Sequence, residues 1–170
     1  MSKLISNAKI QARLEEIAEQ INKKYNEITL LITLTGGVYT AIDLSKYITI
    51  PCKLEFVKVS SYGAAEESSG IVELKYISKK KGSDLGNVLI IDDIYDTGNT
   101  MDFLIKYIKA NYKFSSLDTF VLLEKPARRE KELDITFTGF TIDNLFVYGY
   151  GLDLDEYERN VKDIMVKEWR

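Results

Sequence analysis

Hydrophobic residues recur along this chain with two different spacings, and each spacing predicts one type of element. Between residues 6 and 25, apolar side chains recur every three or four positions, as on the buried face of a helix. They are Ile10, Leu14, Ile17, Ala18 and Ile21. Residues 38–47 and 101–111 show similar helical patterns. The pattern therefore predicts three helices that each bury one face.

Shorter apolar runs between these helices predict strands. Residues 29–34, 88–91 and 117–123 are rich in apolar and β-branched side chains over the length of a strand, which is typical of strands inside a core. Residues 52–56 alternate apolar and charged side chains, and a polar loop at residues 60–70 follows them. The alternation of strands with helices favours an α/β fold.

The 170-residue chain has the size and composition of one globular domain, with 45% hydrophobic and 29% charged residues. Its net charge of -3 argues against a broad nucleic-acid surface. No apolar run approaches the roughly 20 residues of a membrane-spanning helix. The first residues lack the apolar core of a signal peptide. We therefore expect a cytoplasmic protein with no nucleic-acid or membrane partner.

Two residue types that often carry chemistry are scarce in this chain. The single cysteine, Cys52, excludes an internal disulfide and a cysteine zinc cluster. The chain contains no histidine, so any catalytic proton transfer must use Asp, Glu, Lys, Tyr or water.

Residues 88–100 carry the most informative order of residue types. The apolar run 88–91 leads into Asp92 and Asp93, and residues 96–100 then read Asp-Thr-Gly-Asn-Thr before a helical pattern. Ligands of open α/β sheets bind at the carboxyl ends of parallel strands. There Gly98 allows close backbone approach, and a helix N-terminus offers free N–H groups to an anion. Asp92 and Asp93 suit sugar hydroxyls or a hydrated Mg²⁺.

A simpler interpretation of residues 88–100 is a junction between a strand and a turn, with solvated acids and a capping threonine. This interpretation explains one acid and one glycine, but it does not explain the whole ordered set. We therefore interpret the stretch as a binding loop.

Residues 88–100 resemble the phosphoribosyl-diphosphate-binding motif of the type I phosphoribosyltransferases. That motif has four apolar residues, two acids, two further residues and then Asp-Thr-Gly-x-Thr. Other segments resemble the hypoxanthine-guanine members of the family, in the expected order. They are the diphosphate loop at 34–37, the tip of the catalytic lid at 61–63, the base-recognising lysine segment at 122–126, and the aromatic and metal-binding segment at 146–153.

The resemblance implies a mainly parallel sheet flanked by helices, with a small hood built from the terminal segments. It implies one phosphoribosyltransferase domain over residues 1–170. It also implies assembly as a homodimer or homotetramer.

The resemblance further implies which residues hold phosphoribosyl diphosphate. They are Asp92, Asp93, Thr97, Gly98, Asn99, Thr100, Thr35, Gly36 and Arg159. Asp92 and Asp93 would hold Mg²⁺ at the ribose hydroxyls, and Asp153 would hold a second Mg²⁺. Asp96 would be the general base or acid near purine N7.

The purine would meet a different set of residues. Lys125 would donate to the 6-oxo group, because a cationic lysine has donors only and rejects a 6-amino group. Phe146 would stack on the base, and the Val147 backbone would meet its edge. Ser61 and Tyr62 would belong to a lid that closes over the reacting centre.

Three positions depart from the family pattern. Thr35 stands where many relatives have a basic residue, Asn99 occupies a variable position of the phosphate loop, and Tyr148 is bulkier than the valine common beside the base. In the family, the bond equivalent to Leu34–Thr35 is cis.

The resemblance implies a Mg²⁺-dependent enzyme of purine salvage. It would join hypoxanthine or guanine to phosphoribosyl diphosphate, giving the nucleoside monophosphate and diphosphate. One alternative is a xanthine-guanine enzyme, and another is a non-catalytic regulator that binds nucleotide or RNA on the same fold. The presence of Asp96, Lys125, Asp153 and Arg159 together argues against the regulator, and the net negative charge argues against RNA.

Overall fold

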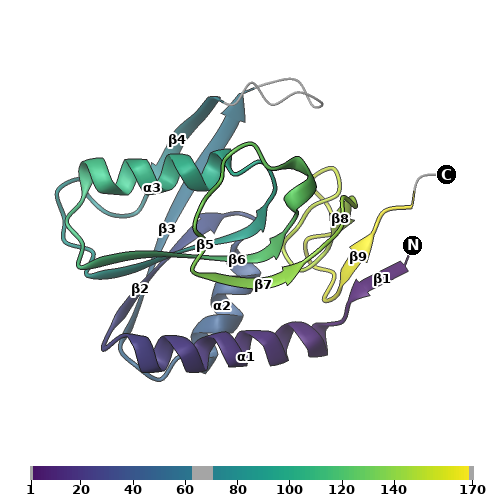
Figure 1. Cartoon of the computed structure of the whole chain (residues 1–170), viewed down its shortest axis with the longest axis horizontal. Helices are drawn as coiled ribbons and strands as arrows, with labels where there is room; N and C mark the ends of the chain where they lie inside the picture. Colours follow the sequence, from purple (N-terminus) through teal and green to yellow (C-terminus); the bar gives the residue numbers. More distant parts are fainter. Residues whose placement is uncertain (1, 63–70, 169–170) are drawn as a thin grey trace.

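The apolar runs of the sequence assemble into a six-stranded sheet in the computed structural model, which describes residues 2–62 and 71–168 (Figure 1). In spatial order the strands are β4 (Ile71–Ile77), β3 (Cys52–Tyr62), β2 (Ile28–Leu34), β5 (Asn87–Tyr95), β6 (Ser116–Glu124) and β7 (Phe137–Thr141). Neighbouring strands are parallel, except that β3 and β4 pair antiparallel. The predicted α/β fold with a mainly parallel sheet is confirmed.

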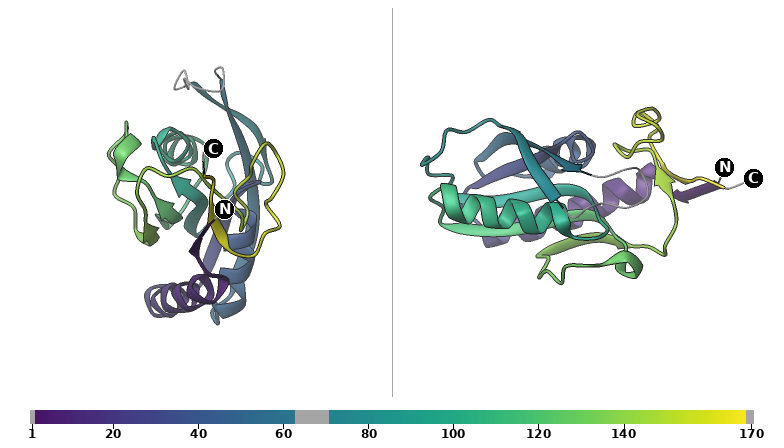
Figure 2. Two further views of the ribbon diagram at one scale, coloured as in Figure 1. Left: turned by 90° about the vertical axis from the view of Figure 1, so that its right-hand side faces the viewer. Right: turned by 90° about the horizontal axis from the view of Figure 1, so that it is seen from above.

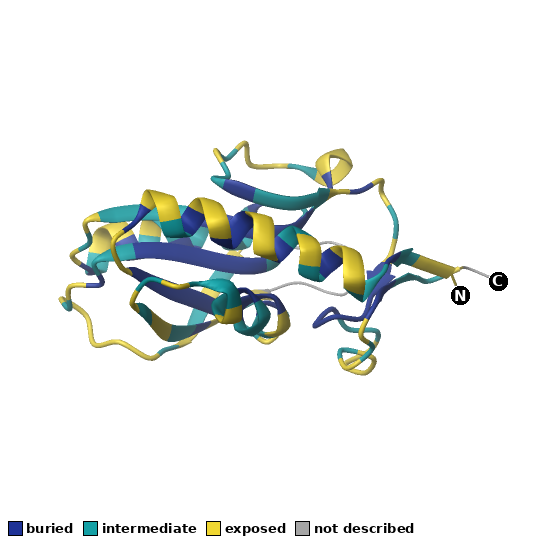
Figure 3. Ribbon diagram, turned by 90° about the horizontal axis from the view of Figure 1, so that it is seen from below, coloured by how far each residue is buried: buried dark blue, intermediate teal, exposed yellow. Residues whose placement is uncertain are grey.

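Helices cover both faces of this sheet. The helices α1 (Asn7–Lys24) and α2 (Val38–Tyr47) lie on one face, and α3 (Asn99–Asn111) lies on the other (Figure 1). Side chains of β2 alternate between the two layers, because Leu30 and Ile32 pack with α1 and Leu31 packs with α3. Figure 3 shows the central strands buried and α1 with alternating buried and exposed positions, as its sequence pattern predicted.

A second, antiparallel sheet forms the predicted hood. Its order is β1 (Ser2–Ile5), β9 (Ile164–Val166) and β8 (Val147–Tyr148). Ser2 lies opposite Val166, so segments from the two ends of the sequence lie side by side (Figure 2). Such short strands have no measurable periodicity, and β1 and β9 were not predicted as strands.

Several local features differ from the sequence-based expectation or fall outside the described residues. β5 extends to Tyr95, so Asp92 and Asp93 belong to the strand and do not follow it. The Leu34–Thr35 peptide bond is cis, as in the family. A short 3-10 helix, η1 (Pro126–Arg128), follows β6. β3 extends to Tyr62, so residues 60–62 of the predicted loop belong to a strand. The rest of the predicted lid loop lies at residues 63–70, outside the described residues. Within the described ranges, no helix is long and apolar enough to cross a membrane.

Candidate active site

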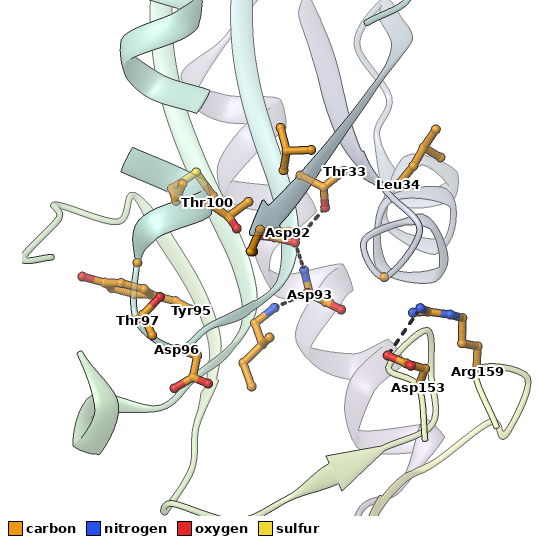
Figure 4. Close-up of a pocket in the computed structure, with 16 residues that line it drawn as sticks. Thr33, Leu34, Asp92, Asp93, Tyr95, Asp96, Thr97, Thr100, Asp153 and Arg159 are labelled. Atoms are coloured by element: carbon orange, nitrogen blue, oxygen red, sulfur yellow. Dashed lines mark hydrogen bonds and ion pairs between the residues drawn. The ribbon is translucent and has the colours of Figure 1, made fainter. Parts of the chain in front are cut away.

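A cavity of about 510 Å³ lies where the carboxyl ends of β2 and β5 face the hood (Figure 4). Most of the predicted site residues line it: Gly36, Ser61, Asp92, Asp93, Asp96, Thr97, Gly98, Thr100, Asp153 and Arg159. Figure 4 shows Asp96 and Thr97 on one side and the Asp153–Arg159 pair on the other, with Asp92 and Asp93 between them. The fold therefore brings four separate parts of the sequence to one place.

Two adjacent carboxylates lie between the two sides of the cavity. The Thr33 hydroxyl donates to Asp92 Oδ1 at 2.7 Å, and the Asp93 amide donates to the same oxygen at 2.9 Å. Burial, reinforced by the neighbouring Asp92 charge, holds the pKa of the Asp93 carboxyl well above its ordinary value. The Gly36 backbone approaches so closely that a Cβ there would lie 1.8 Å from Asp93 Oδ2. The pair is therefore fixed in place and short of compensating positive charge.

Asp96 lies beyond this pair, at the start of the predicted phosphate loop. Its Oδ2 is 3.1 Å from a guanidinium nitrogen of Arg128, in η1. Its Oδ1 is buried and accepts no hydrogen bond from any residue that the structure describes. A buried carboxylate oxygen without a donor is a candidate to accept a proton from a ligand.

The loop between β5 and α3 has the geometry of an anion site. Gly98 has a φ of 89°, and α3 begins at Asn99, so the free N–H groups of its first turn lie beside Thr97 and Thr100. This arrangement can bind a phosphate without a lysine or arginine in the loop.

The segment after η1, which no sequence pattern assigned to the site, supports the phosphate loop from outside. The amides of Glu130 and Lys131 both donate to the Thr97 carbonyl at 2.9 Å. The Asn99 side chain donates to Glu130 Oε2 at 3.1 Å, and the Tyr95 hydroxyl donates to the Lys131 carbonyl. Asn99 therefore contacts the supporting segment.

The hood supplies the opposite side of the cavity. Arg159 pairs with Asp153 at 3.3 Å and donates to the Gly151 carbonyl at 2.6 Å. Gly151 lies against the diphosphate loop, because a Cβ there would lie 2.4 Å from the Gly36 carbonyl oxygen. The hood and the diphosphate loop are therefore in direct contact.

The predicted purine residues lie outside the residues that line this cavity. Lys125 is buried with 6% exposure, and its amide donates to the Tyr95 carbonyl at 2.9 Å, so it directly adjoins the end of β5. Phe146 is 42% exposed and has the Lys167 ammonium 5.4 Å from its ring centre, and Val147 is buried in β8. Thr35 is exposed and also does not line the cavity. Nothing is described of the Tyr62 side chain.

Several cavity residues were not predicted from the sequence. They are Thr33, Leu34, Val59, Ile94, Tyr95 and Met101. Parallel pairing of Ile32 with Ile91 places the next residues, Thr33 and Asp92, side by side, and no sequence pattern indicated this register. No pattern in the sequence indicated that Arg128 would pair with Asp96.

The acidic residues of the cavity suit a divalent cation. Mg²⁺ in nucleotide sites is commonly held by one or two carboxylates together with substrate oxygens and water. Asp92 and Asp93 repel each other, which a cation would relieve. Within residues 2–62 and 71–168, no three acidic side chains lie close enough to form a complete protein cage. The residues therefore fit an ion that shares its ligands with a substrate.

Comparisons with known proteins agree with this geometry. Residues 2–155 match the family model described as phosphoribosyl transferase domain. A Mycobacterium avium protein named hypoxanthine-guanine phosphoribosyltransferase is 37% identical over 96% of this chain and 83% of its own length. A crystal structure of a Staphylococcus aureus hypoxanthine phosphoribosyltransferase superimposes with a TM-score of 0.89 at 32% identity, covering 98% of this chain and 91% of that one. A structure of a Trypanosoma cruzi hypoxanthine phosphoribosyltransferase in complex with the product IMP superimposes with a TM-score of 0.85 at 30% identity. That match covers 98% of this chain and 93% of the other.

Proposed function

Because the chain belongs to the phosphoribosyltransferase family, we propose that it transfers the phosphoribosyl group of phosphoribosyl diphosphate to hypoxanthine or guanine. The products are the nucleoside monophosphate and diphosphate, so the enzyme serves purine salvage. One observation carries the proposal: a single cavity joins the Asp92–Thr100 motif to the diphosphate loop and to the Asp153–Arg159 pair. We also propose that residues 1–170 work as one domain and that the chain forms a homodimer or homotetramer.

The two ends of phosphoribosyl diphosphate have separate binding groups in this proposal. The 5′-phosphate binds the amides and hydroxyls of residues 97–100 at the N-terminus of α3. The diphosphate binds the backbone N–H groups of Thr35 and Gly36 and the guanidinium of Arg159. Backbone donors take the place of a basic side chain at Thr35.

The ribose lies between these ends, over the carboxylates of β5. Asp92 and Asp93 accept from the ribose hydroxyls, and Asp153 approaches the diphosphate from the hood. Asp92 and Asp93 would hold one Mg²⁺ and Asp153 a second, and these ions would supply positive charge to the departing diphosphate. Arg159 adds charge on the same side, where negative charge develops as the bond to C1 breaks.

The purine enters between the end of β6 and the hood. The Lys125 ammonium donates to the 6-oxo group, the Phe146 ring stacks on the base, and the Val147 backbone meets the base edge. Support comes from the exposure of Phe146 and from the position of Lys125 next to Tyr95. Asp96 accepts the proton from purine N7 on its buried Oδ1, which has no donor among the described residues.

A single assay tests this function. The purified protein is incubated with phosphoribosyl diphosphate, Mg²⁺ and, separately, hypoxanthine, guanine, xanthine and adenine. We expect nucleoside monophosphate from hypoxanthine or guanine and none from adenine. Product with xanthine and guanine alone would instead identify a xanthine-guanine enzyme. Absence of product with all four bases would overturn the enzymatic proposal.

A further inference from the structure

We propose that Tyr150 is a positioning residue for diphosphate binding, acting through its hydrogen bond to Asp43 in α2. This hydrogen bond sets the distance between the hood and the diphosphate loop. The inference rests on the proposed function, because it assigns a role in holding Asp153 and Arg159 at the reacting end of phosphoribosyl diphosphate. Neither Tyr150 nor Asp43 lines the cavity.

Tyr150 crosses from the hood into the main domain. Its side chain is 2% exposed, and its hydroxyl donates to Asp43 Oδ2 at 2.6 Å. Its ring centre lies 5.9 Å from that of Tyr39, also in α2. The backbone of Tyr150 has a φ of 50°, a conformation that residues with side chains rarely adopt. The chain therefore holds a bulky residue in an unfavourable backbone region while its hydroxyl reaches α2.

Asp43 is held from several directions at the other end of this bond. The Gln11 side chain in α1 donates to the same Oδ2 at 2.9 Å, and the Lys46 ammonium is 3.0 Å from Oδ1. The Tyr47 hydroxyl donates to Gln11 Oε1 at 3.0 Å. Because both helices fix Asp43, the acceptor of the Tyr150 hydroxyl is a rigid point of the main domain.

Both partners of the Tyr150–Asp43 hydrogen bond belong to segments that adjoin cavity residues. α2 begins at Val38, immediately after the diphosphate loop, so its position sets that of Gly36. On the hood side, the next residue after Tyr150 is Gly151, which packs on Gly36 and accepts from Arg159 at 2.6 Å. The Tyr150 hydroxyl thus forms a side-chain hydrogen bond across the boundary between the hood and the main domain. At this boundary, Arg159 and the diphosphate loop must bind the same diphosphate.

The geometry separates this role from general stability. The purine residue Val147 is fixed independently, through pairing of β8 with β9. The 5′-phosphate loop lies on the far side of the cavity and is supported by Glu130 and Lys131. Loss of the Tyr150 hydroxyl should therefore weaken binding of the diphosphate end of the substrate and leave the affinity for the nucleoside monophosphate unchanged.

The test compares Tyr150→Phe with Tyr47→Phe. Each variant loses one tyrosine hydroxyl of the hydrogen-bond network around Asp43, but only Tyr150→Phe loses a bond between the hood and α2. For Tyr150→Phe we expect KM for phosphoribosyl diphosphate to rise about tenfold or more, the size expected for losing a hydrogen bond to a charged group. We expect Kd for IMP to stay within about twofold, and Tyr47→Phe to retain wild-type kinetics.

A second pair of variants tests the acceptor, and it keeps the proposal testable if Tyr150→Phe does not fold. Asp43→Asn keeps an oxygen that can accept from Tyr150, whereas Asp43→Ala does not. We expect Asp43→Asn to retain much more of the wild-type affinity for phosphoribosyl diphosphate than Asp43→Ala does. Adding Tyr150→Phe to Asp43→Ala should cost little more, because both remove one shared bond.

The outcomes distinguish this inference from the proposed function. Wild-type protein without activity on any purine overturns the proposed function first. Active wild-type protein with unchanged KM in Tyr150→Phe overturns the inference alone. An equal loss of affinity for IMP and phosphoribosyl diphosphate, or an equal effect of Tyr47→Phe, also overturns it, because either result indicates general destabilisation.

Discussion

At the scale of single residues, the surroundings of Asp96 support the proposal that it transfers the purine proton in a chain without histidine. One carboxylate oxygen pairs with Arg128, and the other is buried without a donor among the described residues. We predict that Asp96→Asn lowers kcat more than it weakens nucleotide binding, because it removes the base but keeps the shape. General acid–base assistance is typically worth about 10²–10⁴-fold.

Steady-state kinetics with hypoxanthine, together with IMP binding, measure this effect. Asp84→Asn is the matched control, because it removes an exposed carboxylate that accepts from the Gly86 amide and does not line the cavity. An unchanged kcat in Asp96→Asn would exclude Asp96 from proton transfer.

Lys125 is the buried cation that we propose selects the base. It is only 6% exposed and follows β6, directly beside the end of β5. We predict that Lys125→Ala raises KM for 6-oxopurines and changes KM for phosphoribosyl diphosphate little, because the phosphate groups bind elsewhere. Lys109→Ala, in the last turn of α3, is the control for loss of a lysine. Equal damage to both substrates would contradict the prediction.

The sequence predicted the residues of the cavity better than it predicted their contacts. The Asp92–Thr100 motif is local, so its order alone indicated most of the binding loop. Arg128 and Lys131 contact that loop only after β6 has paired beside β5, and no local pattern carries that information. Contacts between distant segments depend on strand order and register, which single residues do not encode.

At the scale of elements, the phosphate loop is held between β5 and the segment that follows η1. A Cβ on Gly98 would lie 2.7 Å from the Tyr95 ring and 3.0 Å from the Lys131 carbonyl oxygen. Gly98→Ala should therefore lower the melting temperature and weaken IMP binding. The left-handed backbone alone costs about 1–2 kcal/mol for a residue with a side chain.

Gly82 offers a control for that backbone cost. Its φ is 84°, close to that of Gly98, but a Cβ there would meet no atom within 4 Å. Gly82→Ala should lose a similar backbone contribution without losing nucleotide affinity. If the two variants behave alike in calorimetry and in IMP binding, the close support of the loop is unimportant.

The helix α2 carries a carboxylate whose ionisation stabilises the fold. Burial alone would raise the pKa of Asp43, but hydrogen bonds from Tyr150 and Gln11 and the nearby Lys46 ammonium outweigh it and hold the pKa below its ordinary value. A lowered pKa in the folded state means that the stabilisation is present above the pKa of the unfolded chain. It is lost as pH falls through the folded-state value.

Acid unfolding therefore should involve Asp43. We predict that the free energy of unfolding of the wild type decreases more between about pH 5 and pH 3 than that of Asp43→Asn, because only the wild type must protonate this group. Urea unfolding at several pH values measures the difference. Parallel pH curves for the two proteins would contradict the prediction.

At the scale of the whole molecule, the main sheet could be predicted and the hood could not be derived from periodicity. Strands β2, β5 and β6 are long apolar runs whose burial on both faces leaves a clear pattern. Strands β1 and β9 are both short, and each pairs with a segment at the other end of the sequence, so their formation depends on that pairing. Family resemblance predicted a hood, but not which residues pair in it.

The pairing of Ser2 with Val166 makes the backbone nearly a closed ring. A short flexible linker that joins the two ends should therefore cyclise the protein without moving the hood. Closing a loop of this length removes entropy from the unfolded chain, worth up to about 5 kcal/mol in the chain-entropy model. We predict a higher melting temperature for the cyclised protein than for a linear chain with the same linker, at unchanged kcat.

A circular permutant opened at the exposed turn of residues 79–82 should fold and remain active. Loss of activity in both the cyclised and the permuted protein would mean that the hood requires free ends.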